Sequence, residues 1–227
     1  FLCISFLAAD VSGHELSSAE KTAIALPDSY EGLPGDGPIR GQHEWFQNVW
    51  NQRRGSWFHR KEQDQGAIVF LGDSITHGWR NLPHSFSELK IANRGISGDT
   101  TRGMLIRLDE DVLALNPSAV VMLMGTNDLA DGATPEQISG NVKRMLDAFH
   151  AQNPDMPIIL CRVMPSHPDK KRGPEAIQAI NDALAAIARG DTRITVLDTW
   201  TLFANEEGNA TLDEFPDLLH PNGKGYD

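Results

Sequence analysis

A chain of 227 residues, of which 40% are apolar and 22% charged, is long enough for one sizeable core and has the composition of an ordinary globular domain. Its formal net charge of −11 disfavours nucleic-acid backbones and anionic membrane surfaces as partners, because both would repel the chain. Neutral substrates fit this charge better.

The first segment along the chain, residues 1–9, is almost wholly apolar and ends before Asp10. It is too short to span a bilayer, and its last residues are small, so we interpret it as the remnant of a signal peptide and expect a secreted or periplasmic protein. A buried N-terminal strand is the alternative. If the segment is removed, Cys161 is the only cysteine left, and its apolar neighbours predict a buried thiol.

Two segments of different character follow. Residues 10–42 carry scattered Gly, Pro, Ser and acidic residues without periodicity, which predicts an irregular leader with little chemistry. From His43 to Arg60 aromatic residues recur at helical spacing, which predicts a helix that turns them inward and packs over a sheet. The alternative is that they form a binding wall for a sugar or acyl group. The apolar residues of this stretch are Trp45, Phe46, Val49, Trp50, Trp57 and Phe58.

Beyond Gly66, short apolar stretches alternate with longer amphipathic ones. The predicted strands are Ile68–Leu71, a weak one near Leu89–Ala92, Val120–Met124, Ile158–Val163 and Ile194–Leu197. The predicted helices are Thr100–Leu115, Pro135–His150 and Pro174–Ala188, the last two with proline in the first turn. Strands separated by helices imply right-handed crossovers and a parallel sheet between two helical layers.

Ser74 stands where the first predicted strand ends. The apolar run 68–71 breaks at Gly72-Asp73-Ser74, where a helix can begin. Open parallel sheets bind ligands at the carboxyl ends of their strands, beside helix N-termini whose free N–H groups favour negative charge. Ser74 is therefore a candidate nucleophile, although an Asp-Ser pair can also simply cap the helix.

Three further polar clusters follow predicted strands. The turn at residues 97–100 contains Gly98 and leads into a helix. Asn127 can present an amide donor to a developing oxyanion, or it can serve a structural Asx turn. Asp217 lies three residues before His220, a spacing that lets the carboxylate accept the ring Nδ1–H while Nε2 takes a proton from Ser74.

Signals for a metal or cofactor are weak. His77 and His84 can approach one site, but no His-Glu-x-x-His or paired-cysteine spacing occurs, so we expect neither a metal nor a cofactor. The Gly-x-Ser-x-Gly elbow of the other large serine-hydrolase fold is absent around Ser74. Asp73 and Asp128 are expected to brace turns, because a carboxylate beside an oxyanion would oppose its charge.

Taken in chain order, Gly72-Asp73-Ser74, Gly98 in its turn, residues 125–128 and residues 217–220 resemble the four sequence blocks of the SGNH (GDSL-type) hydrolase family. The resemblance spans about residues 68–226. The run from Asn93 to Gly103 is similar to the branch that contains the catalytic subunits of intracellular platelet-activating-factor acetylhydrolase, whose bacterial members are often carbohydrate acetylesterases.

This resemblance implies one SGNH hydrolase domain over residues 43–227, with a flavodoxin-like α/β/α fold and a five-stranded parallel sheet of order 2-1-3-4-5. It makes Ser74 the nucleophile and assigns the oxyanion hole to the N–H groups of Ser74 and Gly98 and the side chain of Asn127. Asp217 and His220 become the orienting acid and the base. The family usually continues into a further helix beyond the position of Asp227.

We therefore expect a metal-independent serine esterase that removes a short acyl group, above all acetate, from a carbohydrate hydroxyl through an acyl-enzyme. The small and polar residues around Ser74 predict a short acyl pocket. The alternative activity is a phospholipid, lysophospholipid or platelet-activating-factor-type acetylhydrolase. The non-enzymatic alternative is a carbohydrate-binding module that retains the fold.

Overall fold

The computed structural model describes residues 15–227, so the predicted signal-peptide remnant at residues 1–9 lies outside the described residues. Within residues 15–227, no helix combines the length and the apolar character that crossing a membrane requires.

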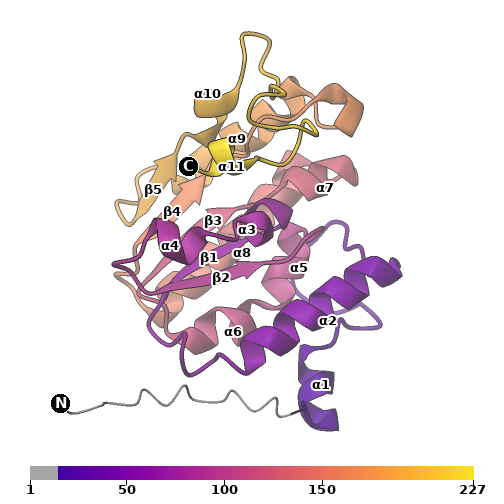
Figure 1. The fold of residues 1–227 in the computed structure, drawn as a ribbon, viewed down its shortest axis with the longest axis vertical. Coiled ribbons are helices and arrows are strands. Elements are labelled where there is room, and N and C mark those ends of the chain that lie inside the picture. The colour runs from indigo at the N-terminus through magenta and orange to yellow at the C-terminus, as the bar shows by residue number, and fades with distance from the viewer. Residues whose placement is uncertain (1–14) are drawn as a thin grey trace, which may run out of the picture.

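The centre of the fold is a five-stranded parallel sheet (Figure 1). Its strands are β1 (Ile68–Gly72), β2 (Ile91–Gly95), β3 (Ala119–Leu123), β4 (Ile158–Cys161) and β5 (Ile194–Leu197). They lie in the order β2-β1-β3-β4-β5, which confirms the predicted α/β fold and strand order. From β1 the chain adds β2 on one side of the sheet, and it then adds β3, β4 and β5 on the other side, so the strand order reverses between β1 and β3. Sheets of this kind bind ligands in the crevice at the carboxyl ends of the two strands beside this switch point.

The helices of the described chain connect these strands. Before the sheet lie α1 (Ser18–Ile24) and α2 (Glu44–Phe58). Between β1 and β3 lie α3 (Ser74–Gly78), α4 (Leu82–Ser85), α5 (Thr101–Ile106), α6 (Leu108–Asp111) and the 3₁₀ turn η1 (Leu113–Leu115). Beyond β3 lie α7 (Thr126–Ala130), α8 (Pro135–Gln152), the 3₁₀ turn η2 (Pro168–Lys170), α9 (Pro174–Ala188), α10 (Thr199–Phe203) and α11 (Gly223–Tyr226).

Two predicted elements differ from the structure. The weak strand placed near Leu89–Ala92 begins at Ile91 instead, since the register pairs Ile68 with Ile91 and Gly72 with Gly95. The single helix predicted over Thr100–Leu115 is broken into α5, α6 and η1. The break falls at Arg107, whose buried guanidinium turns back to donate to Asp99 at 2.8 Å.

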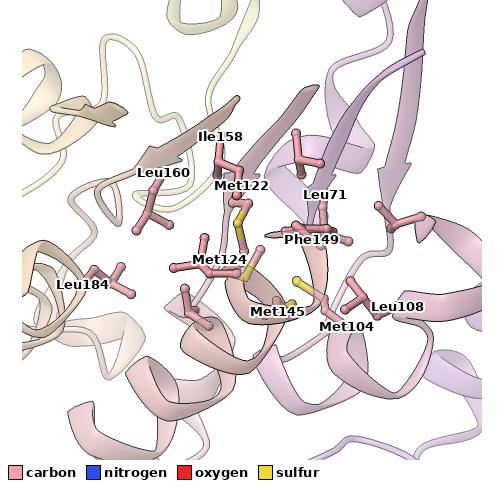
Figure 2. Packing of buried hydrophobic residues seen from close by; sticks show 14 of the residues in the cluster. Leu71, Met104, Leu108, Met122, Met124, Met145, Phe149, Ile158, Leu160 and Leu184 are labelled. Carbon is pink, nitrogen blue, oxygen red and sulfur yellow. The ribbon is translucent and has the colours of Figure 1, made fainter. Parts of the chain in front are cut away.

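One face of the sheet carries the main hydrophobic core. Because side chains alternate along a strand, Leu71, Met122 and Leu160 point to the same face, and Figure 2 shows them opposite Phe149 of α8 and Leu184 of α9. All five side chains are almost fully buried. The apolar side chains that recur every 3.6 residues on α8 and α9 thus pack against those that alternate along the strands, and together they form one core.

The opposite face of the sheet is more open. In Figure 1, α3, α4 and α11 lie in front of it. The remaining surface is an apolar groove of about 380 Å³, and strand residues on this face, such as Ile159 and Leu197, remain 38% and 48% exposed. Cys161 in the groove lining is buried, which confirms the predicted buried thiol, and this burial raises its pKa to about 12.

Two predictions about the segments before the sheet differ from the structure. The leader is not wholly irregular, because Ser17 and Glu20 form a capping box at the start of α1. The prediction that α2 packs over the sheet is wrong: Figure 1 shows this helix beside β2 and α5. Its buried aromatic residues form a separate small cluster, made up of Ile39, Phe46, Trp50, Trp57 and Ile96. Trp45 stays outside this cluster and is 48% exposed.

Candidate active site

Ser74 is positioned by the turn between β1 and α3. Asp73 caps the helix by accepting the N–H of Ile75 at 2.9 Å, and Ser74 follows as the first helical residue. Its own N–H therefore has no partner within the helix. The turn needs a glycine at position 72, because a Cβ there would lie 2.6 Å from the carbonyl oxygen of Leu123 and 2.2 Å from the Thr76 hydroxyl.

The structure brings Asp217 and His220, which lie close to the C-terminal end of the described chain, next to Ser74. The Ser74 hydroxyl lies 2.8 Å from His220 Nε2, and His220 Nδ1 lies 2.7 Å from Asp217 Oδ2. With Nδ1–H donating to the carboxylate, Nε2 is free to accept the serine proton. The predicted three-residue spacing thus produces a continuous hydrogen-bonded chain from carboxylate to hydroxyl.

The loop that carries this pair is held in a strained turn. Leu218 adopts φ of 62°, in the left-handed region that non-glycine residues rarely occupy. This turn lets the other Asp217 oxygen accept the N–H groups of Leu219 at 3.0 Å and His220 at 2.7 Å. Ser166, which follows β4, donates to the Leu218 carbonyl at 2.9 Å and ties the loop to the sheet.

Hydrogen bonds within this loop also set the charge of Asp217. Burial raises the pKa of its carboxyl group, but the backbone N–H and the ring of His220 both donate to the carboxylate and outweigh that effect. The pKa of Asp217 therefore lies below its usual value. Asp217 is ionised at neutral pH and can stabilise a positive charge on His220.

The two other predicted donors lie after the strands that flank β1. Gly98 has φ of +85° in the turn after β2, and a Cβ at this position would lie 2.4 Å from the Trp45 ring. Both the backbone and the space therefore require glycine here. Asn127 is in the first turn of α7, directly after β3, and is 3% exposed.

Sequence reasoning missed two arginines at Asn127. The Oδ1 atom of Asn127 accepts from Arg40 Nη1 and Arg172 Nη2, both at 3.2 Å, while Nδ2 donates to the carbonyl oxygen of Asp99 at 3.0 Å. Arg40 thus places a residue of the leader, a segment expected to carry little chemistry, in contact with Asn127. Neither arginine has a periodic or motif signal in the sequence, because both lie in irregular connections.

Asp73 and Asp128 brace turns, as the sequence predicts. Asp128 accepts the N–H of Thr101 at 3.0 Å and its hydroxyl at 2.5 Å, which joins α7 to α5. Burial raises the pKa of Asp128 to about 7 and that of Asp73 to about 6. Both carboxyl groups are fully buried and accept hydrogen bonds from nearby turns, so they are structural parts of the site.

His77, one turn after Ser74, belongs to a neighbouring polar pocket. Its Nδ1 accepts the hydroxyl of Ser97 at 2.8 Å and the backbone N–H of Ser97 at 3.3 Å. Within residues 15–227, no group of three or more His, Cys, Asp or Glu side chains is placed to hold a metal ion. The two hydrogen bonds between His77 and Ser97 help to hold the turn that contains Gly98.

The arrangement suits acyl transfer. A hydroxyl in contact with an imidazole, which is itself oriented by a carboxylate, is the geometry of an activated serine nucleophile. Two backbone N–H groups and an amide side chain come from the turns at the ends of β1, β2 and β3. Donors of this kind stabilise the oxyanion of a tetrahedral intermediate.

Comparison with known proteins shows the family of this chain. Residues 70–227 match the profile of the GDSL-like Lipase/Acylhydrolase family. The chain is 28% identical over 218 residues to platelet-activating factor acetylhydrolase IB subunit alpha1 of Homo sapiens, an alignment that covers 92% of this chain and 87% of that protein.

Two solved structures extend the comparison. A GDSL-like lipase from Bacteroides thetaiotaomicron superposes with a TM-score of 0.65 at 31% identity, over 73% of this chain and 84% of the other. An acetyl-xylooligosaccharide esterase from Geobacillus, at 21% identity, has a TM-score of 0.56 over 71% of this chain and 90% of the other. The second likeness concerns the fold alone.

Proposed function

Because the chain belongs to the GDSL-like lipase/acylhydrolase family and is a carboxylic ester hydrolase, we propose that it cleaves short-chain acyl esters, above all acetyl esters of carbohydrates, with Ser74 as its nucleophile. The observation that carries this proposal is the hydrogen-bonded chain from Asp217 through His220 to Ser74, with distances of 2.7 and 2.8 Å.

The reaction proceeds in two steps. Ser74 Oγ attacks the ester carbonyl carbon while His220 Nε2 takes the serine proton, and the tetrahedral intermediate collapses as His220 returns that proton to the leaving alcohol. Water then attacks the acyl-enzyme with His220 again as base, which releases the carboxylic acid and restores the serine hydroxyl. Asp217 stabilises the imidazolium that forms in each step.

The oxyanion of each tetrahedral intermediate is held by the N–H groups of Ser74 and Gly98 and by Asn127 Nδ2. These donors are in place before the reaction, so they need little reorganisation when the charge develops. Ser74 also begins α3, and the positive end of the backbone dipoles in its first turn favours the same negative charge.

Replacement of Ser74 by Ala tests the nucleophile. Turnover of p-nitrophenyl acetate should disappear in Ser74→Ala, and a fluorophosphonate should label the native protein but not this variant. Ser87→Ala is the matched control, because Ser87 is an exposed serine outside the site. Unchanged turnover in a folded Ser74→Ala protein would remove Ser74 from the mechanism. Absence of both turnover and labelling in the native protein would favour the binding-module alternative.

Trp45 supports the carbohydrate part of the proposal. Its indole ring is 48% exposed and contacts Gly98, a proposed oxyanion-hole residue. An exposed aromatic ring at this position can stack on the apolar face of a sugar whose ester lies over Ser74. A net charge of −11 also favours a neutral carbohydrate over an anionic phospholipid surface.

A substrate comparison with Trp45→Ala tests this assignment. We expect the variant to raise KM for an acetylated xylooligosaccharide and to leave turnover of p-nitrophenyl acetate unchanged, since the smaller ester does not reach the ring. Leu212→Ala, which removes another exposed apolar side chain, should change neither. Equal losses on both substrates would reassign Trp45 to packing of the Gly98 turn. Faster cleavage of platelet-activating-factor-type phospholipids than of any acetylated sugar would favour the lipid alternative.

A further inference from the structure

The amide group of Asn127 has four hydrogen-bonding positions, and protein groups occupy three of them. Its Oδ1 atom accepts from Arg40 and from Arg172, and one N–H donates to the carbonyl oxygen of Asp99. A primary amide has two donor hydrogens and two acceptor lone pairs. The second N–H is therefore the position that remains for the oxyanion of a substrate.

The same three bonds fix which way the amide points. Rotation of the group by half a turn would place the Nδ2 hydrogens against two guanidinium donors and Oδ1 against the Asp99 carbonyl oxygen. All three hydrogen bonds would be lost, and each would be replaced by a repulsive contact. The two arginines thus exclude the orientation in which Asn127 has no donor to offer.

Both guanidinium groups are themselves anchored. Arg40 makes a bidentate ion pair with Asp131, with distances of 2.6 and 2.9 Å. Arg172 is 6% exposed, and its other donors are bound to the carbonyl oxygens of Thr126 at 2.8 Å and Lys170 at 2.6 Å. Planar forks held at both edges have little freedom, so they can keep the Asn127 amide in one place.

We propose that Arg40 and Arg172 are positioning residues that orient and polarise Asn127 as an oxyanion-hole donor, an inference that rests on the esterase function proposed above. Charge-assisted donors on Oδ1 draw electron density from the amide, which strengthens the remaining N–H as a donor. Arg40 lies before the segment that matches the family profile, so a residue of the leader completes the site.

The experiment measures kcat and KM on p-nitrophenyl acetate for Arg40→Met and Arg172→Met, alone and combined with Asn127→Ala. Loss of an oxyanion-hole donor itself costs about 10²–10³-fold in kcat, so loss of its orientation should cost about 10-fold to 100-fold, with KM changed by less than about twofold. In the Asn127→Ala background, each arginine substitution should cost less than about threefold more, because the group it acts on is gone.

Arg102→Met is the matched control for Arg40→Met. Arg102 donates to the carbonyl oxygens of Tyr30 and Gly37 and so holds the same leader segment, but these hydrogen bonds do not involve Asn127. We expect this variant to keep the native kcat. An equal loss of kcat in Arg102→Met and Arg40→Met would overturn the inference in favour of general attachment of the leader.

Two other results would also overturn it: a change in KM alone, or an arginine penalty of the same size with and without Asn127. If Arg172→Met does not fold, Arg40→Met decides, because the Arg40 side chain is partly exposed and its loss leaves less buried polar surface unpaired. Failure of the esterase function is seen separately, as absence of both turnover and fluorophosphonate labelling in the native protein.

Discussion

At the scale of single residues, the surroundings of two carboxyl groups near Ser74 shift their pKa values in opposite directions. Asp217 is partly exposed, receives three hydrogen bonds and stays ionised, whereas Asp73, next to Ser74, is fully buried and has a pKa raised to about 6. The two carboxyl groups thus differ in pKa because they differ in burial and in the hydrogen bonds that they accept.

His77 shows the same principle with a histidine, and it predicts a pH dependence of stability. Burial, with Arg53 and Arg80 nearby, lowers the pKa of His77 to about 4. In the unfolded chain a histidine takes up its proton near pH 6.5. The unfolded state therefore binds more protons between these two pH values, and the free energy of unfolding should fall as the pH falls from about 6.5 to about 4.

Urea unfolding of the native protein and of His77→Asn between pH 4 and 7.5 measures this effect. The asparagine cannot take up a proton, so the stability advantage of the native protein over His77→Asn should shrink as the pH falls through that window. A difference that stays constant with pH would contradict a depressed pKa at this position.

At the scale of secondary structure, Ser74 and Asn127 each lie in the first turn of a helix that directly follows a strand, whereas Asp217 and His220 lie in the loop before α11. Gly72 ends β1 and Ser74 begins α3, and Asn127 lies in the first turn of α7 after β3. Hydrogen bonds between neighbouring strands hold these ends within a few ångströms of one another. The sheet therefore provides the rigid support, and the short turns provide the chemistry.

The capping box of α8 predicts a measurable contribution to stability. Thr134 accepts the N–H of Gln137 at 3.3 Å, and the Gln137 side chain accepts the N–H of Thr134 at 3.0 Å. Thr134→Ala should lower the free energy of unfolding by about 1 kcal/mol, because this helix packs directly on the core. Chemical denaturation checks the value.

The equivalent capping box on α1 is the natural comparison. Ser17→Ala should cost less than Thr134→Ala in global unfolding, because α1 has seven residues and buries only Ile24, so it can fray without opening the core. Equal costs for the two substitutions would show that α1 unfolds together with the sheet.

At the scale of the whole molecule, the two faces of the sheet differ, and the difference bears on acyl length. The apolar groove on the open face is lined by Ile75 and Thr76 but not by Ser74, Gly98 or His220. An added methylene gains about 0.8 kcal/mol only if it finds buried apolar surface. We therefore expect kcat/KM to fall from acetyl to butyryl to octanoyl esters.

A series of p-nitrophenyl esters at fixed pH, kept below micelle formation, measures this order. Specificity that rises from two to eight acyl carbons would contradict the short acyl pocket and would show that the groove behind Ile75 admits acyl chains.

Sequence alone was enough for the architecture of the sheet and for the residues that form the hydrogen-bonded chain. Apolar runs that end in glycine or a polar turn predicted the five strands, because a strand buried between helices needs several consecutive apolar residues. Asp217 and His220 are only three residues apart, so their mutual contact could be predicted from this short spacing. Their approach to Ser74 was implied by the resemblance to the SGNH family and not by their position along the chain, because α10 lies between β5 and Asp217.

Only the tertiary structure decided what surrounds Asn127 and where α2 lies. Arg40 and Arg172 are 87 and 45 positions from Asn127 and lie in irregular connections, whose backbone course depends on contacts throughout the molecule and leaves no periodic pattern. The aromatic spacing of α2 predicted a buried face but not its neighbour, since an apolar stripe can pack on a sheet, on another helix or beside an edge strand. Periodicity determines which side chains are buried, and the fold determines what they meet.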